Sequence, residues 1–187
     1  MSSEQTRPAL AAVAAQLAAD GGLLAGALLD EGQVELDSTD PQLGALAAAG
    51  PLSAGREQQI AVVVEAVYEG FLLHAGSSRI LNPSDADLNI LAGDRLYALG
   101  LAQLAALGDL ASVRELSDVI AICSQARALG DLSLADAAWQ LAASAIGWGS
   151  SPASEAAKAT VTSDPQAAAA ALSAAARQLR GELAQSG

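Results

Sequence analysis

The chain has 187 residues, 46 of them alanine, with 52% hydrophobic and only 3% aromatic residues. Alanine and leucine favour helices, and β-branched and aromatic residues are scarce, so an all-β fold is excluded and the length suits one compact domain. Twenty-one acidic against nine basic residues give a net charge of −12, which argues against nucleic acid or an anionic lipid surface as a partner.

The start of the chain carries none of the positive charge of a signal peptide. Its apolar stretch, residues 9–29, is interrupted by Gln16, Asp20 and two glycines, so we expect no transmembrane segment. Cys123 is the single cysteine, which permits no internal disulfide and fits a reducing compartment. The expected location is the cytoplasm.

The sequence predicts a series of helices joined by short loops. Asp40, Ser151 and Asp164 each precede a proline, a pattern typical of an N-cap followed by the first helical residue. Ser84, Ser112 and Ser133 resemble the first residues of capping boxes, and glycines at 21, 50, 108 and 130 are typical of helix ends. The helices are expected at 8–19, 22–30, 41–49, 54–74, 84–107, 111–129, 132–146, 152–161 and 165–184.

These elements predict an all-α, antiparallel helical bundle forming a single domain over residues 1–187. Residues 8–161 are expected to form the helical core. Residues 162–187 contribute an Ala-rich C-terminal helix with few large apolar side chains, which predicts loose packing.

The segment 84–107 is apolar on nearly every side, so it must be covered by other helices of its own domain or by another chain. Gly93 and Gly100 lie seven residues apart on one side, which indicates close approach of a second helix. Asp94 and Arg95 interrupt this apolar helix, so we expect them to be paired, to face a polar cavity or to lie at an interface.

Motifs for catalysis are absent from the sequence: it has no nucleophile elbow, phosphate-binding glycine loop or Cys/His metal spacing. Asp37 and Asp40 are interpreted as loop residues with an N-cap, and Asp85 and Asp87 as acidic residues of a first helical turn. His74 and Cys123 are interpreted mainly as structural residues. We therefore predict no catalytic residue, no metal site and no cofactor.

The run Ile90-Leu91-Ala92-Gly93-Asp94-Arg95-Leu96, continued to Ala105, resembles the Gly-Asp helix of trans-polyprenyl diphosphate synthases. The following Leu107-Gly108-Asp109 and the upstream Leu72-Leu73-His74-Ala75 are similar to that family as well, and the likeness covers about a third of the chain. It implies part of the isoprenoid synthase fold.

This chain departs from the family where the family binds substrate. Active members carry an aspartate-rich cluster that holds a diphosphate through Mg²⁺, and here the same place reads Gly76-Ser77-Ser78-Arg79-Ile80-Leu81-Asn82. The basic diphosphate clamps and a second aspartate-rich motif are also missing. The chain thus looks like the non-catalytic small subunit of heterodimeric heptaprenyl or hexaprenyl diphosphate synthases, which modulates product length or stability.

The resemblance implies a protein partner and maps the subunit interface onto Gly93, Tyr97, Gly100 and Leu104. Two alternatives stay open: a helical adaptor of another assembly without isoprenoid chemistry, and a stand-alone enzyme that uses Asp85, Asp87 and Asp94. Self-association is compatible with each of these hypotheses.

Overall fold

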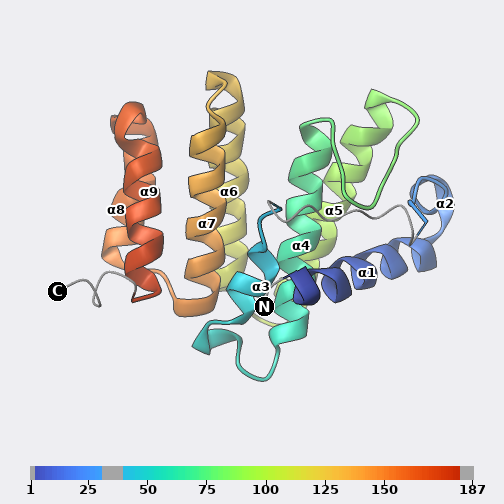
Figure 1. Cartoon of the computed structure of the whole chain (residues 1–187), viewed down its shortest axis with the longest axis horizontal. Coiled ribbons are helices and arrows are strands. Elements are labelled where there is room, and N and C mark those ends of the chain that lie inside the picture. The colour runs from blue at the N-terminus through green and yellow to red at the C-terminus, as the bar shows by residue number, and fades with distance from the viewer. Residues whose placement is uncertain (1–2, 31–39, 182–187) are drawn as a thin grey trace. The chain divides into compact units, whose positions relative to one another are not determined.

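The computed structural model describes residues 3–30 and 40–181 and confirms the all-α fold. Its contacts divide the chain into two compact units, described separately here (Figure 1): unit 1 comprises residues 1–45 and 58–107, and unit 2 comprises residues 46–57 and 108–187. The elements in order are α1 (Ser3–Asp20), α2 (Gly22–Ala25), α3 (Leu43–Ala48), the 3₁₀ helix η2 (Pro51–Ser53), α4 (Glu57–His74), α5 (Ala86–Ala106), α6 (Leu110–Leu129), α7 (Leu132–Trp148), α8 (Pro152–Ser163) and α9 (Pro165–Leu179).

Unit 1 is built on α1, α4 and α5. Each helix contributes an apolar stripe at helical spacing, and residues of the loop after α4 close the cluster. Burying such a leucine or isoleucine side chain contributes about 1.5–3 kcal/mol. The core consists of Leu10, Val13, Leu17, Ala66, Leu73, Ile80, Leu81, Ala92, Leu96 and Leu99.

Unit 2 is a set of antiparallel helix pairs in which α7 packs against both α6 and α9 (Figure 1). The α7 helix is the most apolar of the long helices, and Trp139 and Leu141 are almost fully buried. The Ala-rich α9 also packs against α8, and its Ala168 and Leu172 are fully buried. Small side chains therefore bring these helices together closely.

Helix starts confirm some predicted caps and correct others. Ser151 and Asp164 cap α8 and α9 as predicted, each followed by proline. The predictions at Ser84, Ser112 and Ser133 were wrong, because Asp85, Asp109 and Asp131 are the N-caps of α5, α6 and α7. The aspartate that accepts the backbone hydrogen bond instead follows Ser84 by one residue and precedes Ser112 by three and Ser133 by two.

The helix predicted at 22–30 is much shorter than expected, because α2 ends at Ala25. The chain then leaves the helix to pair with the loop after α4: Leu29 N donates to Ile80 O at 3.0 Å, and Asn82 N donates to Ala27 O at 2.8 Å. These long-range hydrogen bonds replace the helical ones that local propensity favours.

Candidate functional site

The predicted interface glycines lie on the face of α5 that packs against α4 of the same chain. A Cβ atom on Gly93 would lie 2.8 Å from the His74 ring, and one on Gly100 would overlap the Val67 side chain. Leu104 is almost fully buried, and the Tyr97 ring lies against Gly70 of α4. The predicted close approach of a second helix is therefore made by α4. The assignment of these four residues to an interface with another chain stays a prediction.

Asp94 and Arg95 do not pair with each other, although they are adjacent. Asp94 Oδ1 lies 3.2 Å from His74 Nε2 of α4, and Arg95 Nη2 lies 2.5 Å from Asp20 Oδ2 of α1. About two thirds of the Asp94 side chain and half of the Arg95 side chain are exposed. The two charges thus link α5 to its neighbours on either side at the surface of unit 1.

A buried charged cluster in unit 1 joins α4 to the loop that follows it. Arg79 Nη2 lies 2.6 Å from Glu65 Oε2, and Arg79 Nε donates to Glu69 Oε1. Both carboxylates are fully buried, and they accept further hydrogen bonds from Gly44 N and Ser78 Oγ. The guanidinium also lies over a tyrosine ring, so this loop is held to α4 by several contacts at once.

Burial and pairing act in opposite directions in this cluster. Burial raises the pKa of Glu65, against the lowering effects of Arg79 and of the Gly44 N–H. Desolvation would lower the pKa of Arg79, but the two carboxylates outweigh it and raise that pKa. Two carboxylates therefore share one permanent cation.

Sequence reasoning missed this cluster. Glu65 and Glu69 stand at i, i+4 in a helix that is otherwise almost entirely apolar, and that spacing signals a buried cation nearby. The identity of the cation depends on the loop conformation, which local patterns do not specify.

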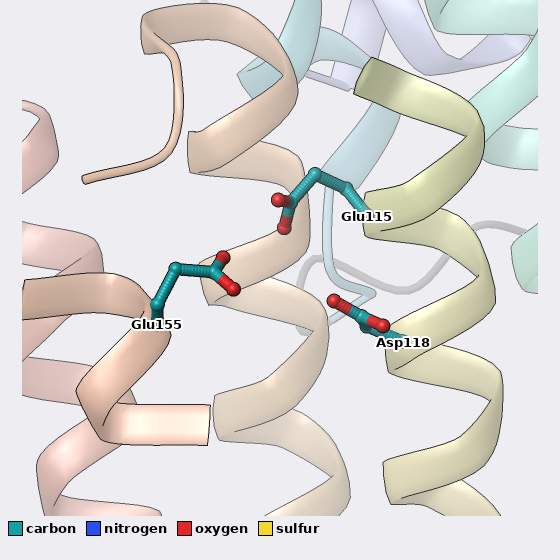
Figure 2. A group of neighbouring side chains, drawn as sticks. All are labelled: Glu115, Asp118 and Glu155. Atoms are coloured by element: carbon teal, nitrogen blue, oxygen red, sulfur yellow. The ribbon is translucent and has the colours of Figure 1, made fainter. Parts of the chain in front are cut away.

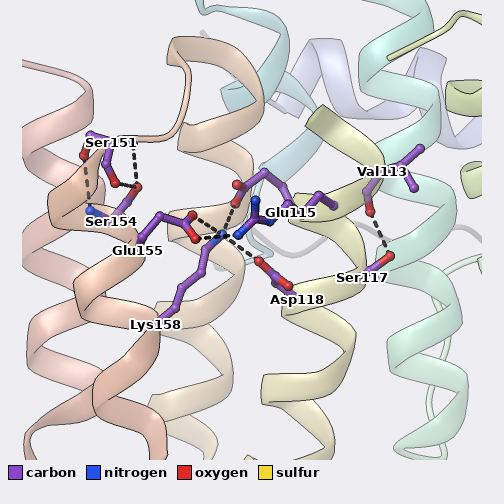
Figure 3. A network of polar contacts seen from close by, with 9 residues as sticks. Val113, Glu115, Ser117, Asp118, Ser151, Ser154, Glu155 and Lys158 are labelled. Carbon is purple, nitrogen blue, oxygen red and sulfur yellow. Dashed lines mark hydrogen bonds and ion pairs between the residues drawn. The ribbon is translucent and has the colours of Figure 1, made fainter. Parts of the chain in front are cut away.

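A second charged cluster lies in unit 2, between α6 and α8 (Figure 2). Glu115, Asp118 and Glu155 bring carboxylate oxygens within 4.8 Å of one another. Figure 3 shows the Lys158 ammonium at the centre of this group, with Nζ 2.8, 2.8 and 3.0 Å from the three carboxylates in that order. Lys158 is the single lysine of the chain, and sequence reasoning did not assign it a role.

Three carboxylates at this spacing are the one group among the described residues that could hold a metal ion. The ammonium already pairs with each of them, so a divalent cation would have to displace Lys158. Burial raises the pKa of Glu115 despite its contact with Lys158, while hydrogen bonds to the three carboxylates raise the pKa of Lys158 against desolvation. The arrangement is an ion network in which three carboxylates share one ammonium.

A small cavity beside this cluster is lined by Leu52, Arg56, Asp109, Glu115 and Ile146, among others. Its volume is about 60 Å³, which is room for a few water molecules. Arg56 Nη2 lies 2.7 Å from Asp109 Oδ2 at its edge. The charged groups that line the cavity are thus paired, Arg56 with Asp109 and Glu115 with Lys158.

Other residues considered from the sequence have structural surroundings. Cys123 is buried in unit 2, and burial raises the pKa of its thiol to about 12, which confirms it as a core residue. Asp85 serves as an N-cap, and Asp87 lies exposed in the first turn of α5. Asp37 lies outside the described residues, so its interpretation stays a prediction.

Comparisons with protein-family models, with curated proteins and with solved structures found no match. The resemblance to prenyl diphosphate synthases therefore stays a prediction carried by the residues quoted above. Of the helices in the described ranges, none has both the length and the apolar character needed to cross a membrane.

Proposed function

We propose that this chain is a non-catalytic helical subunit that binds a catalytic trans-prenyl diphosphate synthase and modulates its product length or stability. The observation that carries the proposal is the position of Arg79. The resemblance places a Mg²⁺-binding aspartate cluster directly after the helix that ends at His74, and in this chain that loop supplies a buried cation instead.

A cation at that place works against diphosphate chemistry through Mg²⁺. Arg79 pairs with both Glu65 and Glu69, which are fully buried and bound by hydrogen bonds on several sides. Carboxylates held in this way are not presented to a metal ion at the surface. The same residues that fix the loop thereby favour a scaffold function over turnover.

The second carboxylate group points in the same direction. Lys158 pairs with Glu115, Asp118 and Glu155, so the metal-competent spacing of these residues is satisfied within the chain. The exposed apolar side chains of α5, Ile90 at 51% and Leu91 at 61%, are surfaces suited to protein contact.

The test is reconstitution with a catalytic polyprenyl diphosphate synthase from the same organism. Light scattering on the mixture is expected to show a complex, and product analysis with an allylic diphosphate, isopentenyl diphosphate and Mg²⁺ is expected to show a changed chain length or rate. The chain alone is expected to give no product.

Three results would contradict the proposal. Turnover by the purified chain would establish the stand-alone enzyme, and Asp85, Asp87 and Asp94 would be the residues to substitute next. Absence of a complex with unchanged products would remove the synthase partner. Stable binding to an unrelated protein instead would establish the adaptor alternative.

A further inference from the structure

One face of α5 is exposed along its length. Asp87, Leu91, Asp94 and Ala98 recur at helical spacing on one side of α5, and all four are exposed; only Asp94 reaches α4, through His74. Ile90 flanks this row and is half exposed. We call these five residues the α5 outer surface.

A further exposed leucine lies on α2, the helix that follows the partner of Arg95. Leu91 lies one turn before Arg95, whose guanidinium is paired with Asp20 at the end of α1. Leu23 follows Asp20 by three residues and is 77% exposed. Leu23 is thus a further exposed leucine close in sequence to the residue that pairs with α5, and burial of such exposed side chains would be favourable.

The charges around these side chains are mostly acidic. Asp85 caps α5, Asp87 lies in its first turn and Asp94 near its middle, and Asp20 adds a fourth carboxylate. Arg95 and the His74 ring are their paired basic groups. A second copy of the chain would bring equal acidic surfaces together, and anionic lipid would be repelled as well, so charge complementarity selects a basic occupant.

We propose that the α5 outer surface is the docking site for a basic amphipathic helix of a partner protein. The apolar face of that helix covers Leu91 and Ile90, and the small Ala98 side chain allows the two helices to approach closely. Lysine or arginine residues flanking the apolar face pair with Asp87 and Asp94. This inference rests on the proposed function only in that a protein partner binds.

The test uses synthetic peptides of 18 residues and the full chain. The probe is a helical peptide with leucines on one face and lysines flanking them; the controls are a scrambled peptide of the same composition and an amphipathic peptide with glutamate in place of lysine. Binding is measured by fluorescence anisotropy for the wild type, Leu91→Ser and Leu132→Ser. Leu132 is 79% exposed in unit 2 and serves as the matched control.

The basic amphipathic peptide is expected to bind, and Leu91→Ser is expected to weaken binding about tenfold, as loss of one buried leucine implies. Leu132→Ser is expected to change binding less than twofold, and Asp87→Asn to weaken it and to reduce its salt dependence. Circular dichroism checks that each variant is folded.

Equal binding of the scrambled peptide, or equal losses in Leu91→Ser and Leu132→Ser, would overturn the docking site. So would a dimer of the free chain that dissociates in Leu91→Ser, because the occupant would then be a second copy. The two proposals fail separately: a synthase complex that survives Leu91→Ser removes only this docking site, whereas peptide binding without any synthase complex removes only the synthase partner.

Discussion

In each of the two charged clusters one cation pairs with several carboxylates, and the clusters differ in how deeply they are buried. Arg79 in unit 1 sits between two fully buried glutamates, and its planar guanidinium donates to both. Lys158 in unit 2 pairs with three carboxylates, two of which are more than a third exposed. Arginine suits the dry, directional site, while the ammonium suits the wetter one.

Because the clusters differ in burial, removal of the cation is expected to lower the stability of the protein by different amounts. Removing the cation from a dry site leaves carboxylates that water cannot reach, whereas removing it from a wet site lets water replace it. The variants below test this ranking, starting with the largest expected effect.

Arg79→Met is expected to lower the free energy of unfolding by about 3–5 kcal/mol at pH 7, because it leaves Glu65 and Glu69 buried without a cation. Urea titration measures the loss. The loss should shrink as the pH is lowered toward 4, since protonation removes the uncompensated charge and burial already raises the pKa of Glu65.

The control for this variant is Arg114→Met, which breaks an ion pair with Glu155 at the surface of unit 2. Its loss should stay below about 1 kcal/mol. Equal losses in the two variants would show that the Arg79 cluster is accessible to water and would remove the ranking by depth.

Gly100→Leu is expected to cost about 2–3 kcal/mol, because the new side chain would overlap Val67 and press on Val63 of α4. Ala98→Leu places the same side chain on the opposite, exposed face of α5 and should change stability by less than about 0.5 kcal/mol. Urea titration and light scattering on both variants distinguish packing of Gly100 against α4 from a position of Gly100 at an interface between chains. Unchanged stability with a lost oligomer in Gly100→Leu would instead place Gly100 at the predicted interface between chains.

Local signals in the sequence predicted most of the helices and the glycine contact on α5. Most helix starts were predicted within a few residues, because caps and prolines act on neighbouring backbone groups; α1 begins at Ser3, five residues before its predicted start. The glycines of α5 indicated a close helix, yet the sequence alone did not identify α4 as that helix. The periodicity of apolar and small residues shows which face of a helix is packed, but it does not show which other helix packs against that face.

Features that depend on distant parts of the chain were not predictable in the same way. The α2 helix stops early because Ala27 and Leu29 pair with the backbone fifty residues later. The division into two units is also non-local, since residues 46–57 join unit 2 although unit 1 residues lie on both sides of them in the sequence. Lys158 pairs with Glu115 and Asp118, about forty residues earlier in the chain, and the sequence around Lys158 does not indicate this pairing.

Among the test variants, as distinct from their controls, Lys158→Met is expected to have the smallest effect, a loss of about 1 kcal/mol at pH 7, because two of its three partners, Asp118 and Glu155, are partly exposed and screened by water and only Glu115 is buried. The size of this loss depends on pH. The folded state raises the pKa of Lys158, so its contribution is complete below pH 10.5 and declines as the pH rises through the folded value.

The stability difference between the wild type and Lys158→Met, measured by urea titration from pH 8 to 12, should therefore decrease toward zero at the alkaline end. Lys158 is the single lysine of the chain, so no other lysine titrates in this pH range. The two tyrosines are present in both proteins, so their titration does not distinguish the wild type from the variant. A difference that stays constant to pH 12 would mean that the methylene groups of Lys158, rather than its charge, stabilise unit 2.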